Sequence, residues 1–237
     1  MPSRSRSSTP TRDLAPAPPA AAAGEASTRG AILDAAEMLF AKQGFKATTT
    51  KEIGAAAGMN PALISYYFGG KEALYREVLH RLFAELGAEG ARRIDPALSP
   101  DRAVARFVEV QVAFLSTHQT MPRLMARELV DHEARHAQPA LTELAAAIFE
   151  RLCSVIRTGQ AQGLFRTDLD PRHAAISIVA QVIYLFIARP AVGILLGYGP
   201  HGLPQQEVEA FGRHAARFAL AALSSGSAAA SPRGSET

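Results

Sequence analysis

One stretch of this sequence, residues 48–71, restricts the fold more than any other. It reads TTTKEIGAAAGMNPALISYYFGGK. Its threonines place hydroxyl groups where a short helix can begin, because a threonine at that position accepts a hydrogen bond from a free backbone N–H. Gly58 suits the left-handed residue that ends such a helix, and Asn60 and Pro61 suit the cap and first residue of a second helix. The stretch therefore predicts a helix-turn-helix, the arrangement whose second helix enters the major groove of DNA.

The composition favours helices and a reducing compartment. Of the 237 residues, 48% are hydrophobic and 20% are charged, and clusters of β-branched residues are few. The single cysteine, Cys153, excludes an intramolecular disulfide and a cysteine-based zinc cluster, and we expect it to be a small buried side chain. We therefore expect a cytoplasmic protein. The net charge of +3 allows a polyanionic partner without requiring one.

The chain divides into two tails and a helical middle. Residues 1–26 and 224–237 are rich in Ser, Pro, Ala and Arg, which predicts disordered tails and no signal peptide. Between them, apolar residues recur three and four positions apart, as in amphipathic helices. The predicted helices run at about 28–43, 51–57, 61–68, 71–86, 99–117, 121–136, 139–162, 171–188 and 205–223.

The apolar run at residues 174–188 is too short for a membrane span. It falls below the roughly 20 residues that a span requires, it contains Gln181, and Arg189 and Pro190 follow it directly. A helix that is apolar nearly all round is otherwise covered on both sides. We therefore expect no membrane partner, and a second subunit packed against this helix.

Residues 26–86 resemble the TetR family of bacterial transcription regulators. The resemblance includes the first helix ending in F-x-x-Q-G-F, the TTT cap, the I-x-x-x-A-G turn, the YYF ending and the G-K-E-A-L that follows. Further along, residues 123–133 and 187–197 are similar to the CecR-like branch of that family.

The resemblance implies an all-α homodimeric regulator that is not an enzyme and needs no cofactor. Its N-terminal three-helix helix-turn-helix DNA-binding head would occupy residues 27–86. A larger helical body for ligand binding and dimerisation would occupy residues 87–223. A small-molecule effector in the body would shift the connecting helix and weaken binding to a pseudo-palindromic operator in double-stranded DNA, as expected of a repressor. Residues 171–188 and 205–223 of each subunit would form the dimer as a four-helix bundle.

The candidate DNA contacts lie at the starts of the three helices after the first and along the recognition helix. Outward side chains of that helix would meet base edges, while tyrosine hydroxyls and helix N-termini would meet phosphates. The alternative is that the aromatic residues are ordinary core. The recognition helix has no arginine or lysine, so Lys46, Lys51, Lys71 and the N-terminal arginines would supply the charge. The candidates are Thr49, Thr50, Lys51, Asn60, Ala62, Leu63, Ser65, Tyr66, Tyr67 and Lys71.

A second motif, His132-Glu133-Ala134-Arg135-His136, spells H-E-x-x-H. On a helix it would place two imidazoles one turn apart beside a carboxylate, as in zinc peptidases. The hypothesis is a metal-dependent hydrolase, or a regulator whose effector is a metal, with a third ligand such as His118 or His173. The flanking residues are polar and Pro139 follows soon after, so we favour a polar corner between helices and expect no metal.

The effector would occupy an apolar cavity in the body. Large apolar side chains and one histidine on the body helices have suitable chemistry for an apolar ligand, although ordinary core packing is the commoner role of each such side chain. The candidates are Phe114, His118, Met121, Met125, Phe149, Tyr184 and Phe186.

Overall fold

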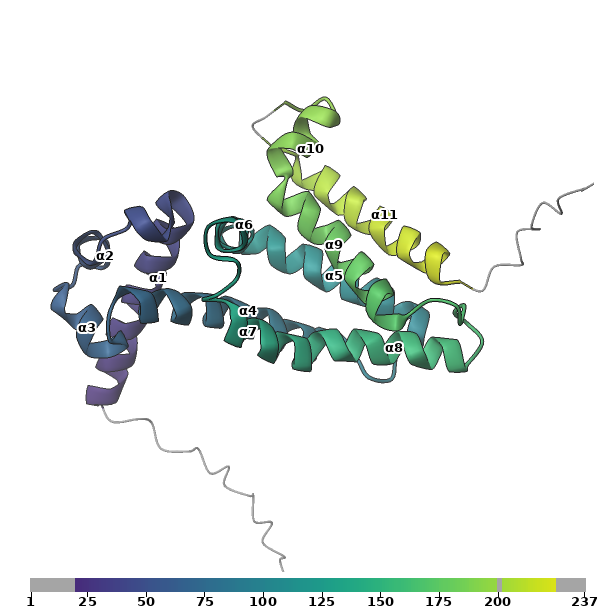
Figure 1. Cartoon of the computed structure of the whole chain (residues 1–237), viewed down its shortest axis with the longest axis horizontal. Coiled ribbons are helices and arrows are strands. Elements are labelled where there is room, and N and C mark those ends of the chain that lie inside the picture. The colour runs from purple at the N-terminus through teal and green to yellow at the C-terminus, as the bar shows by residue number, and fades with distance from the viewer. Residues whose placement is uncertain (1–19, 200–201, 225–237) are drawn as a thin grey trace, which may run out of the picture.

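The computed structural model describes residues 20–199 and 202–224, and over these residues the fold is helical (Figure 1). An antiparallel bridge between Phe165 and Ser224 is the one β-type pairing in the described part of the chain. The helices are α1 Ala20–Ala47, α2 Thr50–Ala57, α3 Ala62–Phe68, α4 Lys71–Arg93, α5 Pro100–Thr117, α6 Thr120–His132, α7 Gln138–Leu144, the π-helical turn η1 Ala145–Phe149, α8 Glu150–Ala161, α9 Pro171–Ile187, α10 Arg189–Leu195 and α11 Gln205–Leu223.

The first four helices form the head, at one end of the molecule (Figure 1). Their apolar stripes meet in one core, in which Ile32, Phe40, Ile53, Ile64 and Leu74 are fully buried. The helical path of α1 breaks at Gly44, whose φ of 84° is accessible to glycine without strain, so the predicted end near residue 43 is confirmed.

The start of α1 corrects the prediction for the N-terminal tail. We predicted disorder through residue 26, but α1 already begins at Ala20. Alanine has the strongest helix propensity, and the run Ala20–Ala23 extends the helix outward from the packed part. Residues 1–19 and 225–237 of the two predicted tails lie outside the described residues.

Helix α4 belongs to both the head and the rest of the chain, which we call the body. It continues to Arg93 instead of ending near Leu86, because Leu82 and Phe83 are buried and the body helices α5 and α7 pack against it. The body is built around α5, whose neighbours include α4, α8, α9 and α11.

The body helices follow the sequence prediction with three differences. Helix α6 ends at His132, not near His136, because Glu133 and Ala134 adopt left-handed φ values of 54° and 61°. The predicted helix at 139–162 contains the π-helical turn η1. Helix α10 was not predicted, because Arg189 and Pro190 read as a break, whereas they form the first turn of a new helix.

One further expectation, the burial of Cys153, is met within the described residues. Cys153 is fully buried, and this burial raises the pKa of its thiol. None of the helices at 20–199 and 202–224 is by itself long and apolar enough to cross a membrane; α9 and α10 reach that threshold only as a pair, and they meet at 85°.

Candidate nucleic-acid interface and ligand cavity

Helix α2 begins with a complete capping box. The Thr49 hydroxyl accepts a hydrogen bond from the Glu52 backbone N–H at 3.2 Å, and the Glu52 carboxylate accepts one from the Thr49 backbone N–H at 2.8 Å. The Thr49 hydroxyl also contacts that carboxylate at 2.8 Å, and this bond, together with the one from the Thr49 backbone N–H, holds the pKa of the Glu52 carboxyl below its usual range. At the other end, Gly58 takes the left-handed conformation with φ 67° and its N–H reaches the Ala55 carbonyl. The capping predicted for this helix is confirmed.

The recognition helix α3 is held by its first and last turns. The Asn60 side-chain oxygen accepts a hydrogen bond from the Ala62 backbone N–H at 2.9 Å, and Gly69 ends the helix with φ 78°. Ile64 is fully buried and fixes the helix against the head, whereas the Tyr66 side chain is 76% exposed. One face of α3 is therefore core and the other is free to meet a partner.

Lys71 is an internal anchor at the start of α4. Its ammonium group donates hydrogen bonds to the carbonyls of Phe45 and Thr48, each at 3.0 Å, and lies 4.4 Å from the centre of the Phe45 ring. A lysine ammonium has three donors, so one remains for a phosphate.

The candidate DNA contacts lie on α2, on α3 and at the starts of α2, α3 and α4, and they differ in exposure. The half-buried set is Thr50, Leu63, Tyr67 and Lys71. The exposed set is Thr49, Lys51, Asn60, Ala62, Ser65 and Tyr66.

Helices of the body line an apolar cavity of about 450 Å³. Four predicted ligand residues line it: Met121, Met125, Phe149 and Phe186. Sequence reasoning missed the contributions of α4 and α7 and part of that of η1, which add Phe83, Leu86, Gly90, Leu141, Leu144 and Ile148 to the wall.

The structure places the other three predicted ligand residues outside this cavity. Phe114 and His118 stack on each other with ring centres 3.9 Å apart, and the His118 imidazole lies 3.5 Å from the Glu85 carboxylate. The Tyr184 side chain is 59% exposed on the outer surface of α9.

Gln111 is the polar side chain of the cavity wall. It is buried, and its carbonyl oxygen accepts no hydrogen bond from any residue in the described ranges. An unpaired buried carbonyl costs stability. The signal in the sequence was a lone glutamine between Phe107 and Leu115, at positions four residues apart that otherwise face the core.

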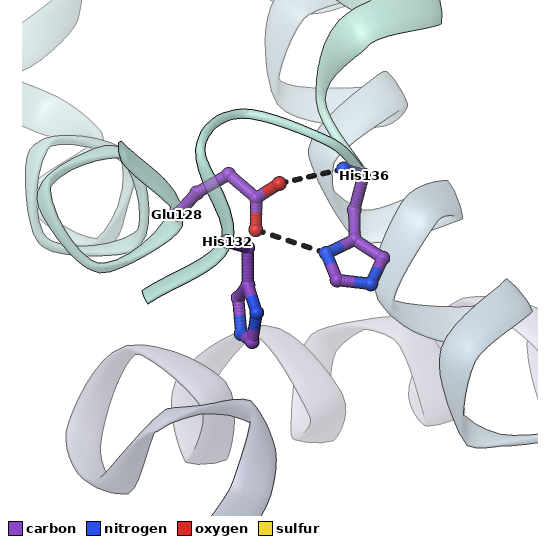
Figure 2. A group of neighbouring side chains, drawn as sticks. All are labelled: Glu128, His132 and His136. Atoms are coloured by element: carbon purple, nitrogen blue, oxygen red, sulfur yellow. Dashed lines mark hydrogen bonds and ion pairs between the residues drawn. The ribbon is translucent and has the colours of Figure 1, made fainter. Parts of the chain in front are cut away.

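The H-E-x-x-H motif has a different geometry from the one its sequence suggests. Glu133 is exposed and in the left-handed conformation, so it does not lie between two imidazoles on a helix. His132 and His136 are nevertheless both buried, and Glu128 lies beside them (Figure 2). The Glu128 carboxylate accepts hydrogen bonds from the backbone N–H groups of His136 at 2.7 Å and Ala137 at 3.2 Å. The corner between helices is therefore present, but it is a buried cluster and not a polar surface.

Comparison with known proteins assigns the family. Residues 32–78 match the family described as "Bacterial regulatory proteins, tetR family". Residues 100–207 match the "Tetracyclin repressor-like, C-terminal domain". The chain belongs to the TetR family. It is a DNA-binding transcription regulator, with the head as its helix-turn-helix domain.

Individual relatives agree with this assignment. The chain is 33% identical to the transcriptional repressor NicS of Pseudomonas putida over 162 residues, which cover 67% of this chain and 75% of NicS. It is 25% identical to the transcriptional repressor KstR2 of Rhodococcus jostii over 157 residues, 66% of this chain and 77% of KstR2. The solved structure of the fatty acid degradation regulator FadR from Bacillus halodurans shares the fold, with a TM-score of 0.65 at 18% identity over 82% of this chain and 98% of FadR. These relatives are regulators, not enzymes.

Proposed function

We propose that this TetR-family protein is a cytoplasmic repressor that binds its operator as a homodimer and releases it when an apolar effector fills the body cavity. Residues 27–86 act as the DNA-binding domain and residues 87–223 as the effector and dimerisation domain. The repressor role is supported by the likeness to NicS, which is named as a repressor.

The observation that carries the effector part is that two helices of the cavity wall also contact the head. Helix α4 contributes Phe83, Leu86 and Gly90 to the wall and begins in the head at Lys71. Helix α6 contributes Met121 and Met125. A ligand that displaces either helix therefore acts directly on the head.

Helix α6 is hydrogen-bonded to α1. The Thr120 hydroxyl donates to the Glu37 carboxylate, and the Arg127 guanidinium donates to the Lys42 carbonyl at 3.3 Å. Arg81 of α4 binds the same Glu37 at 2.6 Å and Asp34 at 2.7 Å. Glu37 thus joins both cavity helices to the first helix of the head.

The chemistry of the wall defines the effector. Apart from the Gln111 side chain, the wall consists of aliphatic, aromatic and methionine side chains. The favoured effector is a mostly apolar molecule with one polar group, which pairs with the Gln111 carboxamide.

The dimer face comprises the outer surfaces of α9, α10 and α11. Large apolar side chains are exposed there, among them Tyr184, Leu195 and Phe218. A patch of this kind on a folded chain favours a protein partner. Ala219 also lies on α11, but its side chain is buried within its own subunit, so it is not part of this surface. Two heads on a two-fold axis would read half-sites about 34–36 Å apart.

Operator binding in the presence of ligands tests the proposal. Fluorescence anisotropy with DNA from upstream of the protein's own gene should show binding that weakens steeply with salt. Compounds that raise the melting temperature of the protein should be apolar, and they should weaken operator binding. Stabilisation by highly charged compounds alone, or stabilising ligands that leave DNA affinity unchanged, would refute the effector mechanism.

A further inference from the structure

We propose that Glu128, His132 and His136 form a binding site for one divalent transition-metal ion of the Zn²⁺ type, distinct from the effector cavity. One ligand atom from each of the three residues lies within 4.8 Å of the other two, and all three side chains are buried (Figure 2). Two imidazoles and a carboxylate are a donor set that suits zinc, cobalt and nickel better than magnesium or calcium.

The backbone brings these residues together by a tight turn. His132 is the last residue of α6, and the left-handed Glu133 and Ala134 reverse the chain so that His136 returns to Glu128. The His136 Nδ1 atom then lies 3.2 Å from the Glu128 carboxylate. Donor atoms around a tetrahedral ion are separated by roughly 3.3 Å, because each lies about 2.0–2.1 Å from the metal. One pair therefore already has the required spacing, and the second imidazole needs only a small side-chain movement.

The charge balance of the cluster also favours a cation. Glu128 is fully buried, and no lysine or arginine in the part of the chain that the structure describes forms an ion pair with it. A buried carboxylate requires a compensating charge or several hydrogen bonds. Its hydrogen bonds involve two backbone N–H groups, the Tyr75 hydroxyl and the His136 Nδ1 atom. The first three partners are neutral, so they orient the carboxylate without cancelling its charge.

A protonated His136 would supply one positive charge but would not explain His132. The His132 side chain is buried, and its ring centre lies 4.7 Å from the centre of the His136 ring. A second imidazolium beside the first would be repelled. A metal ion uses all three side chains, whereas a single proton uses two.

The site lies where the body meets the head. Phe45 of α1 contacts both imidazoles, with ring centres 5.7 and 5.4 Å away, and Tyr75 of α4 does so at 6.4 and 5.3 Å. Phe45 is also the residue whose carbonyl and ring bind Lys71. A bound ion would therefore fix the α6–α7 corner of the body against a wall built by the head.

Calorimetric titration of the full-length, untagged protein with ZnCl₂, after removal of metals with EDTA, tests the site. We expect one Zn²⁺ per subunit at micromolar or tighter affinity, a higher melting temperature with Zn²⁺, and visible absorption bands when Co²⁺ replaces it. Excess Mg²⁺ should not compete. Absence of saturable Zn²⁺ binding to the wild-type protein would overturn the proposal whatever the variants show.

A pair of histidine variants locates the ion. His132→Ala removes one of the three ligands, so Zn²⁺ affinity should fall by at least about tenfold. His80→Ala is the matched control, because His80 is partly exposed, is bound to Glu143 and is not one of the three clustered residues. Equal affinity of His132→Ala and wild type, or loss of binding in His80→Ala instead, would place the ion elsewhere and refute the site. If His132→Ala were unfolded by circular dichroism, the Co²⁺ spectrum of the wild type would decide, since absorption typical of six oxygen ligands excludes the imidazoles.

Discussion

The ammonium group of Lys71 donates a hydrogen bond to the backbone carbonyl of Phe45 at 3.0 Å, and through it the start of α4 is attached to the segment that leads into α2. The same group bonds the Thr48 carbonyl. A lysine that looked like a phosphate contact in the sequence thus also holds the helix-turn-helix to the remainder of the head.

Replacing Lys71 by methionine should therefore destabilise the head. The variant keeps the apolar stem but leaves the two carbonyls without a donor, and hydrogen bonds from a charged group contribute about 1.5–3 kcal/mol each at most. We expect a lower free energy of unfolding in urea together with weaker DNA binding. A Lys71→Met protein that unfolds at the wild-type urea concentration would show that the anchor is dispensable.

Lys51 and Tyr66 should affect DNA binding without affecting stability. Lys51 is exposed, and the Tyr66 side chain projects from the recognition helix into solvent. Lys51→Ala should weaken operator binding and reduce the slope of log affinity against log salt by about 1, as expected for one lost phosphate contact. Tyr66→Ala should weaken binding at an unchanged melting temperature. If both variants gave the same anisotropy curves as the wild type, Lys51 and Tyr66 would not be part of the DNA interface.

Gln111→Leu should stabilise the ligand-free protein and abolish its response to the effector. The substitution removes a buried carbonyl that lacks a partner, which is worth about 1 kcal/mol or more, and it leaves the cavity fully apolar. Gln160→Leu is the control with the opposite sign, because the Gln160 amide donates to the Arg166 and Leu169 carbonyls at 3.0 and 2.9 Å. Thermal unfolding of the two variants measures the difference, and a lower melting temperature for Gln111→Leu would contradict it.

Phe218→Glu should convert the dimer to a monomer at micromolar concentration. The Phe218 side chain is 57% exposed on α11, so a charge there does not disturb the core of the subunit but would be buried in the interface. Val130→Glu is the control, because Val130 is 82% exposed on α6, away from α9–α11. If light scattering showed a dimer for Phe218→Glu, or a monomer for Val130→Glu, the dimer interface would not lie on α9–α11.

Gly159→Ala should destabilise the body by about 1–3 kcal/mol, the usual cost of overpacking. A Cβ atom at Gly159 would lie within 2.2 Å of the Phe165 ring, and that ring is buried between α8 and the end of α11. Gly87→Ala provides the comparison, since its nearest neighbour would be the Leu144 side chain at 4.0 Å. There the gain in helix propensity should raise the melting temperature. Equal effects of the two substitutions would refute the packing argument.

Local chemistry was sufficient to predict the head from the sequence. The caps at Thr49 and Asn60 and the turn at Gly58 depend on residues within four positions of each other. The end of α4 was harder to predict, because its last turns are stabilised by contacts with α5 and α7, and a single sequence does not show such partners. The CecR-like resemblance of residues 123–133 and 187–197 stays a prediction.

The cavity and the metal-binding cluster show a similar limit. Methionine and phenylalanine in the body signalled an apolar wall, but which of them face inward depends on the packing angles of α4, α6 and α9. Phe114 was therefore placed in the cavity although it stacks on His118. In the H-E-x-x-H motif the two histidines were found by their spacing. The relevant carboxylate, that of Glu128, was not found by spacing. It lies beside the histidines because the left-handed residues Glu133 and Ala134 reverse the chain.

The length of α4 has a mechanical consequence. Leu86 at the cavity and Lys71 in the head lie on one unbroken helix, separated by about 22 Å at 1.5 Å per residue. If α4 pivots at the cavity, a tilt of only about 5° displaces its head end by about 2 Å, in proportion to that length. On the proposed effector mechanism, the body need not open widely. A sub-ångström shift of the α4 residues at the cavity would be enlarged along the helix into a misfit between the two recognition helices and their grooves.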